Sequence, residues 1–169
     1  LSRADHIGLS HGMGDPGRYD RRVEAVNFAL NFDDGSRLNG LADADLILVG
    51  VSRCGKTPIC LYLAMQYAIC AANYPLTKDD FLTSELPAAL LEHRERLFGL
   101  TISPARLHRI REERRPGSEY ASLSVCCSEV AATEELFSSN AVPYLDSTAV
   151  SIEELSIEIM QQVGMGRQY

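Results

Sequence analysis

The residues best suited to chemistry form one short run, which follows four apolar residues and precedes a long apolar segment. This run matches the pattern G-x-x-x-x-G-K-[ST], in which backbone N–H groups cradle phosphates. Gly50 and Gly55 tolerate the backbone conformations that such a loop requires. Lys56 supplies a charge for the terminal phosphate, and Thr57 is the expected magnesium ligand. The predicted nucleotide-binding residues are Gly50, Val51, Ser52, Arg53, Cys54, Gly55, Lys56 and Thr57.

Phosphoryl transfer also needs a carboxylate that supports a metal ion or acts as a base. The candidates are Asp146, which ends an apolar stretch, and the pair Asp33 and Asp34, which precedes Gly35. Asp146 is equally compatible with a turn or cap before a helix. An Asp-Gly pair is an ordinary turn signal, and the pattern alone ranks that interpretation first for Asp33 and Asp34.

Arginines crowd a short stretch that is expected to be helical: Arg106, Arg109, Arg111, Arg114 and Arg115. Glutamates lie among them, so the default interpretation is a solvated helix face. Because guanidinium groups match the geometry of phosphate, the sharper alternative is a surface that binds a phosphorylated protein. On that alternative Arg111, Arg114 and Arg115 are the predicted phosphate-binding and target-binding residues.

The composition is that of an ordinary globular protein, with 169 residues, 46% hydrophobic and 23% charged, and predicts about one domain. A formal net charge of -7 argues against a nucleic-acid partner, because no cationic excess can displace phosphate counterions. The apolar run over 58–72 is shorter than the roughly 20 residues that span a bilayer, which argues against a membrane protein. Five cysteines without paired spacing favour a reduced, cytoplasmic protein.

Strand and helix patterns alternate along the chain after residues 1–18, which are expected to form a linker or mobile arm. Strands are expected over 46–49, 70–74, 96–102 and 142–145. Helices are expected over 19–31, 56–69, 104–115, 118–138 and from 151 onward, with short helices and loops over 77–92. In the first helix the expected apolar face holds Val23, Val26, Asn27 and Leu30. Ser103 and Ser151 have the features of helix caps.

This alternation predicts an α/β fold over 19–169, with a mostly parallel sheet flanked by helices, of the P-loop kinase type. Ligands bind at the carboxyl ends of such strands, so Gly50, Thr101 and Asp146 are expected to lie together. A GTPase is excluded because the N-K-x-D signature does not occur and the one D-x-x-G, at 5–8, precedes the loop. A kinase-like phosphotransferase and a nucleotide-binding module without chemistry remain.

Several stretches resemble the bacterial phosphoenolpyruvate synthase regulatory proteins, a family of bifunctional kinase/pyrophosphorylases. The matching stretches are 50–58, 71–76, 97–102, 110–115 and 120–123. The resemblance covers the carboxyl-terminal catalytic region of the family, whose amino-terminal region is expected to be missing. The loop containing Cys54 favours this branch over the pyruvate, phosphate dikinase regulatory proteins. Departures occur at 68–70 and at Cys127, away from the phosphate loop.

The resemblance implies that ADP is the donor for phosphorylation of a threonine on phosphoenolpyruvate synthase, which inactivates that enzyme. It also implies that inorganic phosphate removes the group as pyrophosphate. It changes Asp33 and Asp34 from a turn into catalytic candidates beside Lys56. Mg²⁺ is expected at Thr57 and Asp146, and a homodimer is left open. The alternatives are a nucleotide-binding interaction domain and a small P-loop kinase with another substrate.

Overall fold

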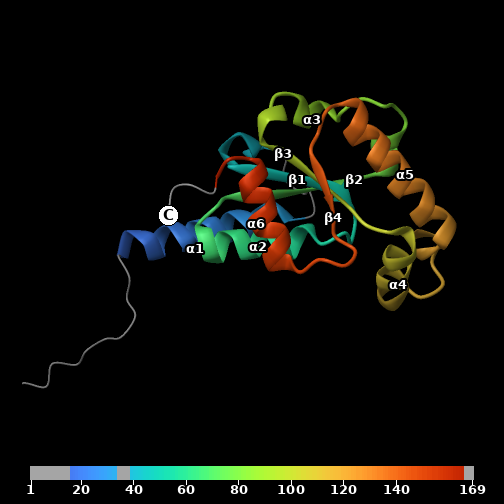
Figure 1. Ribbon diagram of the computed structural model, residues 1–169, viewed down its shortest axis with the longest axis horizontal. Coiled ribbons are helices and arrows are strands. Elements are labelled where there is room, and N and C mark those ends of the chain that lie inside the picture. Colours follow the sequence, from blue (N-terminus) through green and yellow to red (C-terminus); the bar gives the residue numbers. More distant parts are fainter. Residues whose placement is uncertain (1–15, 34–38, 166–169) are drawn as a thin grey trace, which may run out of the picture.

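Four parallel strands form the centre of the protein, in the order β2-β1-β3-β4 (Figure 1). The computed structural model describes residues 16–33 and 39–165. The strands are β1 (Leu46–Val51), β2 (Ala71–Leu76), β3 (Leu97–Thr101) and β4 (Tyr144–Asp146). Every residue of β1 is buried, as in a parallel sheet that is covered on both faces. The predicted α/β fold with a parallel sheet is therefore confirmed.

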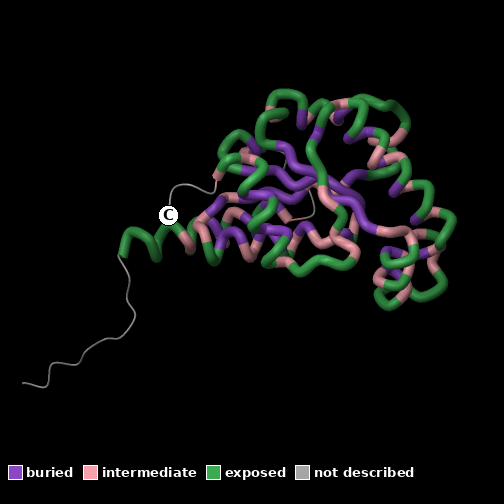
Figure 2. The backbone as a smooth tube through the Cα atoms, viewed as in Figure 1, coloured by how far each residue is buried: buried purple, intermediate pink, exposed green. Residues whose placement is uncertain are grey.

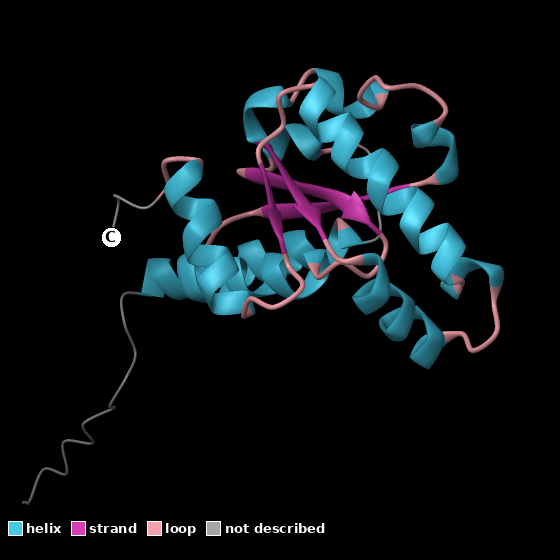
Figure 3. Cartoon of the chain, turned by 45° about the vertical axis from the view of Figure 1, so that its right-hand side comes forward, coloured by secondary structure: helices cyan, strands magenta, loops and turns pink. Residues whose placement is uncertain are grey.

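Helices cover both faces of this sheet (Figure 3). They are α1 (Pro16–Asn31), α2 (Lys56–Tyr67), α3 (Ala88–Leu91), α4 (Pro104–Arg114), α5 (Leu123–Ser139) and α6 (Ile152–Gln162). Short 3-10 turns lie between them, at η2 (Leu41–Asp43), η3 (Lys78–Phe81), η4 (Arg94–Arg96) and η5 (Glu119–Ala121). No helix in the described part of the chain has both the length and the apolar character that a bilayer crossing requires.

Alternate residues of β1 supply two separate cores, because successive side chains of a strand point to opposite faces. Leu46 and Leu48 belong to the core that includes residues of α2 and α6. Ile47 and Val49 belong to the other, with Phe137 of α5. Figure 2 shows the buried strands between these layers. Packing on both faces holds β1 in place, and it therefore also positions the loop that follows β1.

Several boundaries differ from the sequence-based expectation, and three of the differences have a clear structural basis or matter for the sheet. Pro75 lies inside β2 and does not end it, because β2 is an edge strand where a missing N–H costs little. The helix expected over 118–138 is divided into η5 and α5 by Ser122, whose hydroxyl accepts a hydrogen bond from Val125 N. The fourth strand begins at Tyr144, two residues later than expected.

The face of α1 that packs on the protein was predicted wrongly. The helix ends at Asn31 as expected and begins at Pro16, while residues 1–15 of the expected linker lie outside the described residues. Its buried residues are Ala25 and Ala29. Leu30, expected on the apolar face, is 59% exposed. Small side chains let α1 pack closely on α2, so the contact does not follow the larger apolar residues.

The caps of α4 and α6 were predicted correctly. Ser103 Oγ accepts a hydrogen bond from Arg106 N at 3.2 Å, and Ser151 Oγ accepts one from Glu154 N at 3.2 Å. Each bond satisfies an N–H group that has no partner inside its helix. These caps fix where α4 begins after β3 and where α6 begins after β4.

Candidate functional site

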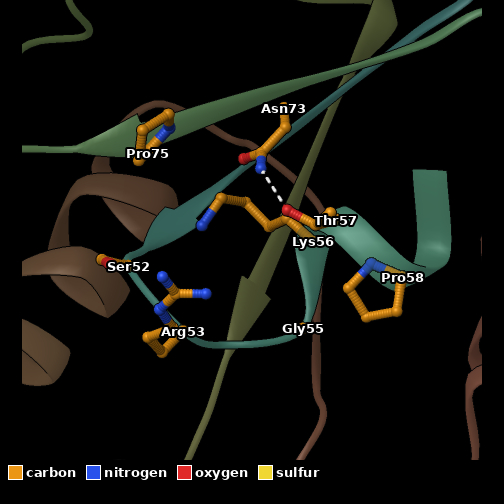
Figure 4. Close-up of a pocket in the computed structure, with 8 residues that line it drawn as sticks. All are labelled: Ser52, Arg53, Gly55, Lys56, Thr57, Pro58, Asn73 and Pro75. Carbon is orange, nitrogen blue, oxygen red and sulfur yellow. Dashed lines mark hydrogen bonds between the residues drawn. The ribbon is translucent and has the colours of Figure 1, made fainter. Parts of the chain in front are cut away.

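The predicted phosphate loop lies between the end of β1 and the start of α2 (Figure 4). Gly55 has φ +101° and Arg53 has φ +75°, so the chain turns through the left-handed region twice. Gly50 has a different role, because a Cβ there would lie 2.6 Å from Leu100 O and 2.8 Å from Cys54 Sγ. One glycine therefore permits the turn, and the other permits close contact with β3.

The loop brings a cation and the N-terminus of a helix to one small pocket. Lys56 is only 3% exposed, and its Nζ donates a hydrogen bond to Val51 O at 2.6 Å. No side chain among the described residues caps α2, whose first residue is Lys56. The positive end of the helix therefore faces the pocket, which has a volume of about 160 Å³. This combination suits a phosphate group.

Asp33 and Thr57, both predicted, lie together, and Asn73 joins them. Thr57 Oγ1 donates to Asp33 Oδ1 at 2.6 Å. Asn73 Nδ2 donates to Asp33 Oδ1 at 2.9 Å and to Thr57 Oγ1 at 2.9 Å. The backbone supports this contact, because Asn73 N donates to Phe32 O at 3.1 Å and so fastens the segment before Asp33 to β2. A carboxylate is thereby held at the first turn of α2.

Sequence reasoning did not identify Asn73 as a site residue. It is buried within β2, in register with Leu48 of β1. A polar residue inside an otherwise apolar strand is an informative signal, because a buried amide must find hydrogen-bond partners. Asp34, the second predicted carboxylate, lies outside the described residues.

Asp146 lies on the other side of the phosphate loop. It is in register with Thr101 of β3, and β3 pairs with β1, so the expected gathering of Gly50, Thr101 and Asp146 at the strand ends is present. Asp146 is nevertheless two strands from β1, or about 10 Å at ~4.8 Å per strand. Its Oδ1 accepts a hydrogen bond from Thr148 N at 2.8 Å. The structure thus places Asp33, and not Asp146, on Thr57.

Arg111 is buried, and the default interpretation as a solvated face is wrong for it. The side chain is 1% exposed, and its Nη2 donates to Glu129 Oε2 at 2.7 Å and to Ser52 O at 3.1 Å. Its guanidinium lies 4.1 Å from the centroid of the Tyr120 ring. The Tyr120 hydroxyl is 2.6 Å from Ser52 Oγ. Arg111 and Tyr120 therefore tether the phosphate loop to α4 and to the segment before α5.

Arg114 and Arg115 are exposed and line a second pocket beside the loop. This pocket has a volume of about 490 Å³, and it shares Ser52, Arg53 and Pro75 with the smaller one. Lys78 also lines it. Glu129, the acidic side chain among the described lining residues, is already paired with Arg111. The second pocket is therefore cationic, although the protein as a whole carries a net charge of -7.

The cysteines of the site are packing residues. Cys54, inside the loop, is buried and free. Burial raises the pKa of the Cys60 thiol to about 12, against a smaller lowering by the charge of Lys56. A thiol with that pKa carries almost no thiolate near neutral pH, and thiolate is the nucleophilic form. This geometry gives Cys60 no role in covalent catalysis.

Comparison with known proteins identifies a matching family model and several relatives of this chain. The model of the kinase/pyrophosphorylase family matches residues 1–160. A relative from Laribacter hongkongensis is 54% identical over 163 residues, which are 96% of this chain and 60% of the relative. One from Halorhodospira halophila is 55% identical over 161 residues, 95% of this chain and 59% of the relative.

A relative from Bordetella avium is 51% identical over 167 residues, which are 99% of this chain and 61% of the relative. All three bear the name "Putative phosphoenolpyruvate synthase regulatory protein". The chain spans about three fifths of the length of these curated relatives. The resemblance inferred from the sequence is confirmed.

Proposed function

The chain belongs to the kinase/pyrophosphorylase family, and we propose that it carries the phosphoryl-transfer site of a regulator of phosphoenolpyruvate synthase. The observation that carries this proposal is the phosphate loop, with Lys56 as the first residue of a helix that no described side chain caps, and with Thr57 Oγ1 hydrogen-bonded to Asp33. The first proposed reaction is ADP-dependent phosphorylation of a threonine on the synthase. The second is phosphate-dependent removal of the same phosphoryl group, which is released as pyrophosphate. The first inactivates the synthase, and the second reactivates it.

The smaller pocket is the proposed site for the phosphates of ADP. Backbone N–H groups at the start of α2 and the Lys56 ammonium offer donors and positive charge to a diphosphate. Lys56 Nζ is held on Val51 O, and it exchanges this carbonyl for a phosphate oxygen when nucleotide binds. Lys56 then stabilises the charge that develops on the transferred group, as phosphate-loop lysines do.

The larger pocket is the proposed site for the target threonine and its phosphate. Arg53, Arg114 and Arg115 supply cations there, next to the nucleotide pocket, and Ser52 belongs to both pockets. In the forward step the threonine oxygen attacks the β-phosphorus of ADP, AMP leaves, and the threonine proton passes to a base. Asp33 and Asp34 are the proposed acid–base and metal-supporting groups. For Asp34 this rests on the sequence alone.

In the reverse step an orthophosphate oxygen attacks the phosphorus of phosphothreonine. The bond between that phosphorus and the threonine oxygen breaks, pyrophosphate leaves, and the proton of hydrogen phosphate ends on the threonine oxygen. Charge and atoms balance without a further reactant. This step brings two anions together, so their repulsion must be offset by positive charge. The phosphate loop and the adjacent cationic pocket can supply that charge.

The test uses the full-length protein, its synthase target and ADP labelled in the β-phosphate. We expect label on the target threonine and AMP as the product, and we expect release of labelled pyrophosphate only when orthophosphate is added. The Lys56→Ala variant, checked for folding, is the control. Transfer from ATP in the absence of ADP, or removal of the group without orthophosphate, would contradict the proposed chemistry.

A second candidate function is nucleotide binding without turnover by this chain alone. The observation that favours it is the length of the chain, about three fifths of its curated relatives. Calorimetry with ADP, followed by a transfer assay with the same sample, separates the two functions. Binding without transfer would assign this chain nucleotide binding without phosphoryl transfer.

A further inference from the structure

Asn73 contains a buried polar atom that none of the described residues satisfies. The side chain is 4% exposed, and its Oδ1 has no hydrogen-bond partner in the described part of the chain. The orientation of the amide follows from its neighbours. Nδ2 faces Asp33 Oδ1 and Thr57 Oγ1, and the reversed amide would place its oxygen against the Asp33 carboxylate. The unpaired atom is therefore an acceptor, and Asn73 lines the phosphate pocket.

Three side chains from three different elements offer oxygen atoms beside this pocket. Asp33 follows α1. Thr57 belongs to the first turn of α2 and Asn73 to β2, and Figure 4 shows these two side chains facing each other. Carboxylate, hydroxyl and amide oxygens are ligands of hard cations such as Mg²⁺. Mg²⁺ in phosphate sites uses one or two carboxylates together with substrate oxygens, and it keeps several waters. A trio with one carboxylate fits that preference.

We propose that Asp33, Thr57 and Asn73 are the protein's share of a magnesium site at the phosphate loop, with Asn73 Oδ1 as an acceptor for metal-bound water. The assignment rests on the proposed nucleotide-binding function. An amide suits the position of Asn73 better than a second carboxylate would. Its nitrogen holds Asp33 and Thr57 in place, its oxygen remains for the water, and it adds no charge beside Asp33.

This assignment moves the metal away from Asp146, the carboxylate that sequence reasoning paired with Thr57. Asp146 is exposed, and Thr148 N and Oγ1 both donate to its Oδ1. It also lies at the end of β4, on the opposite side of β1 from β2. No cluster of three His, Cys, Asp or Glu residues that could hold a metal occurs among the described residues. The proposed site therefore combines one carboxylate, from Asp33, with Thr57, Asn73 and nucleotide oxygens.

The test measures metal binding directly, with Mn²⁺ as the probe. Electron paramagnetic resonance reports free Mn²⁺ in the presence of ADP, and calorimetry gives the ADP affinity with Mg²⁺ and with EDTA. In Asn73→Leu we expect the Mn²⁺ affinity of the ADP complex to fall about 10- to 100-fold, as for other residues that support a metal site. The ADP affinity in EDTA is expected to be retained. Asp146→Asn, the matched control, keeps the metal affinity of the unaltered protein.

The Asn73→Asp variant keeps the size of the side chain and gives a second, opposite readout. A carboxylate beside Asp33 lowers the melting temperature of the metal-free protein by repulsion, and Mg²⁺ with ADP restores it. If Asn73 were purely structural, Mg²⁺ with ADP would raise the melting temperature of the variant by no more than it raises that of the unaltered protein, whereas the proposed site predicts a larger rise in the variant. Normal Mn²⁺ affinity in Asn73→Leu, or its loss in Asp146→Asn, would overturn the site. Failure of the unaltered protein to bind ADP would instead overturn the proposed function.

Discussion

Replacing Arg111 with alanine removes one partner of a buried ion pair and the donors that hold two backbone carbonyls. Its partner Glu129 is 14% exposed, so its charge would remain largely desolvated. Ser52 O and Tyr120 O would also lose their donor, at 3.1 and 3.0 Å. Leaving one partner of a buried pair uncompensated costs about 3–5 kcal/mol. At roughly 2–4 °C per kcal/mol for a protein of this size, the melting temperature should fall by about 6–20 °C.

The paired replacement Arg111→Met with Glu129→Leu separates stability from loop positioning. Removing both charges together is often near neutral, so we expect most of the lost stability to return. Ser52 O still lacks its charged donor, which contributes about 1.5–3 kcal/mol when such a bond is made. If that bond holds the loop in its binding shape, ADP affinity falls by about 10- to 100-fold in the paired variant.

Differential scanning calorimetry and titration with ADP measure these two effects. Arg106→Ala is the matched control, because Arg106 is exposed on the same helix and such changes usually stay within about 0.5 kcal/mol. An unchanged melting temperature in Arg111→Ala would refute the energetic argument. Full recovery of ADP affinity in the paired variant would show that the loop does not depend on Arg111.

Three further predictions concern the other proposed site residues. Lys56→Ala should leave the circular dichroism spectrum unchanged and lower the transfer rate by about 10²- to 10³-fold, because a transition-state contact is lost; near-normal transfer would remove Lys56 from the mechanism. Asp33→Asn should lower the single-turnover rate far more than the ADP affinity measured in EDTA, because its charge matters mainly during transfer; normal turnover would make Asp33 a turn residue. Arg114→Ala should weaken capture of the phosphorylated target more than ADP binding, with Arg106→Ala as control; equal losses would return Arg114 to the solvated face.

The phosphate loop was predictable because its requirements are local. A buried strand, two glycines at fixed spacing and a lysine at the start of a helix all lie within one short segment, and the structure places them together. The parallel sheet was predictable for a similar reason, since β1 lacks polar alternation and helix caps follow β3 and β4. Boundaries were predicted less well where one residue type is compatible with two structures. Pro75 was expected to end a strand, but it lies within β2 because β2 is an edge strand.

The packing of α1 could not be read from its periodicity. Hydrophobic size favoured the face with Val23 and Leu30, whereas the helix packs through Ala25 and Ala29. The preference for alanine arises from how closely the axes of α1 and α2 approach, which is a tertiary property. Asn73 was missed for a related reason, because its partners Asp33 and Thr57 are distant in sequence.

Arginines of one helix have two different roles, and burial separates them. Arg111 is neutralised by Glu129 and is stacked on Tyr120, so its charge is already satisfied and its donors are directed at the backbone of the loop. Arg114 and Arg115 are exposed at the second pocket, where they can meet an incoming anion. A substitution at Arg111 should therefore change the shape of the nucleotide pocket, while one at Arg114 should change the charge seen by the target. Sequence pattern gave these residues a single role because helical spacing cannot distinguish a buried guanidinium from a solvated one.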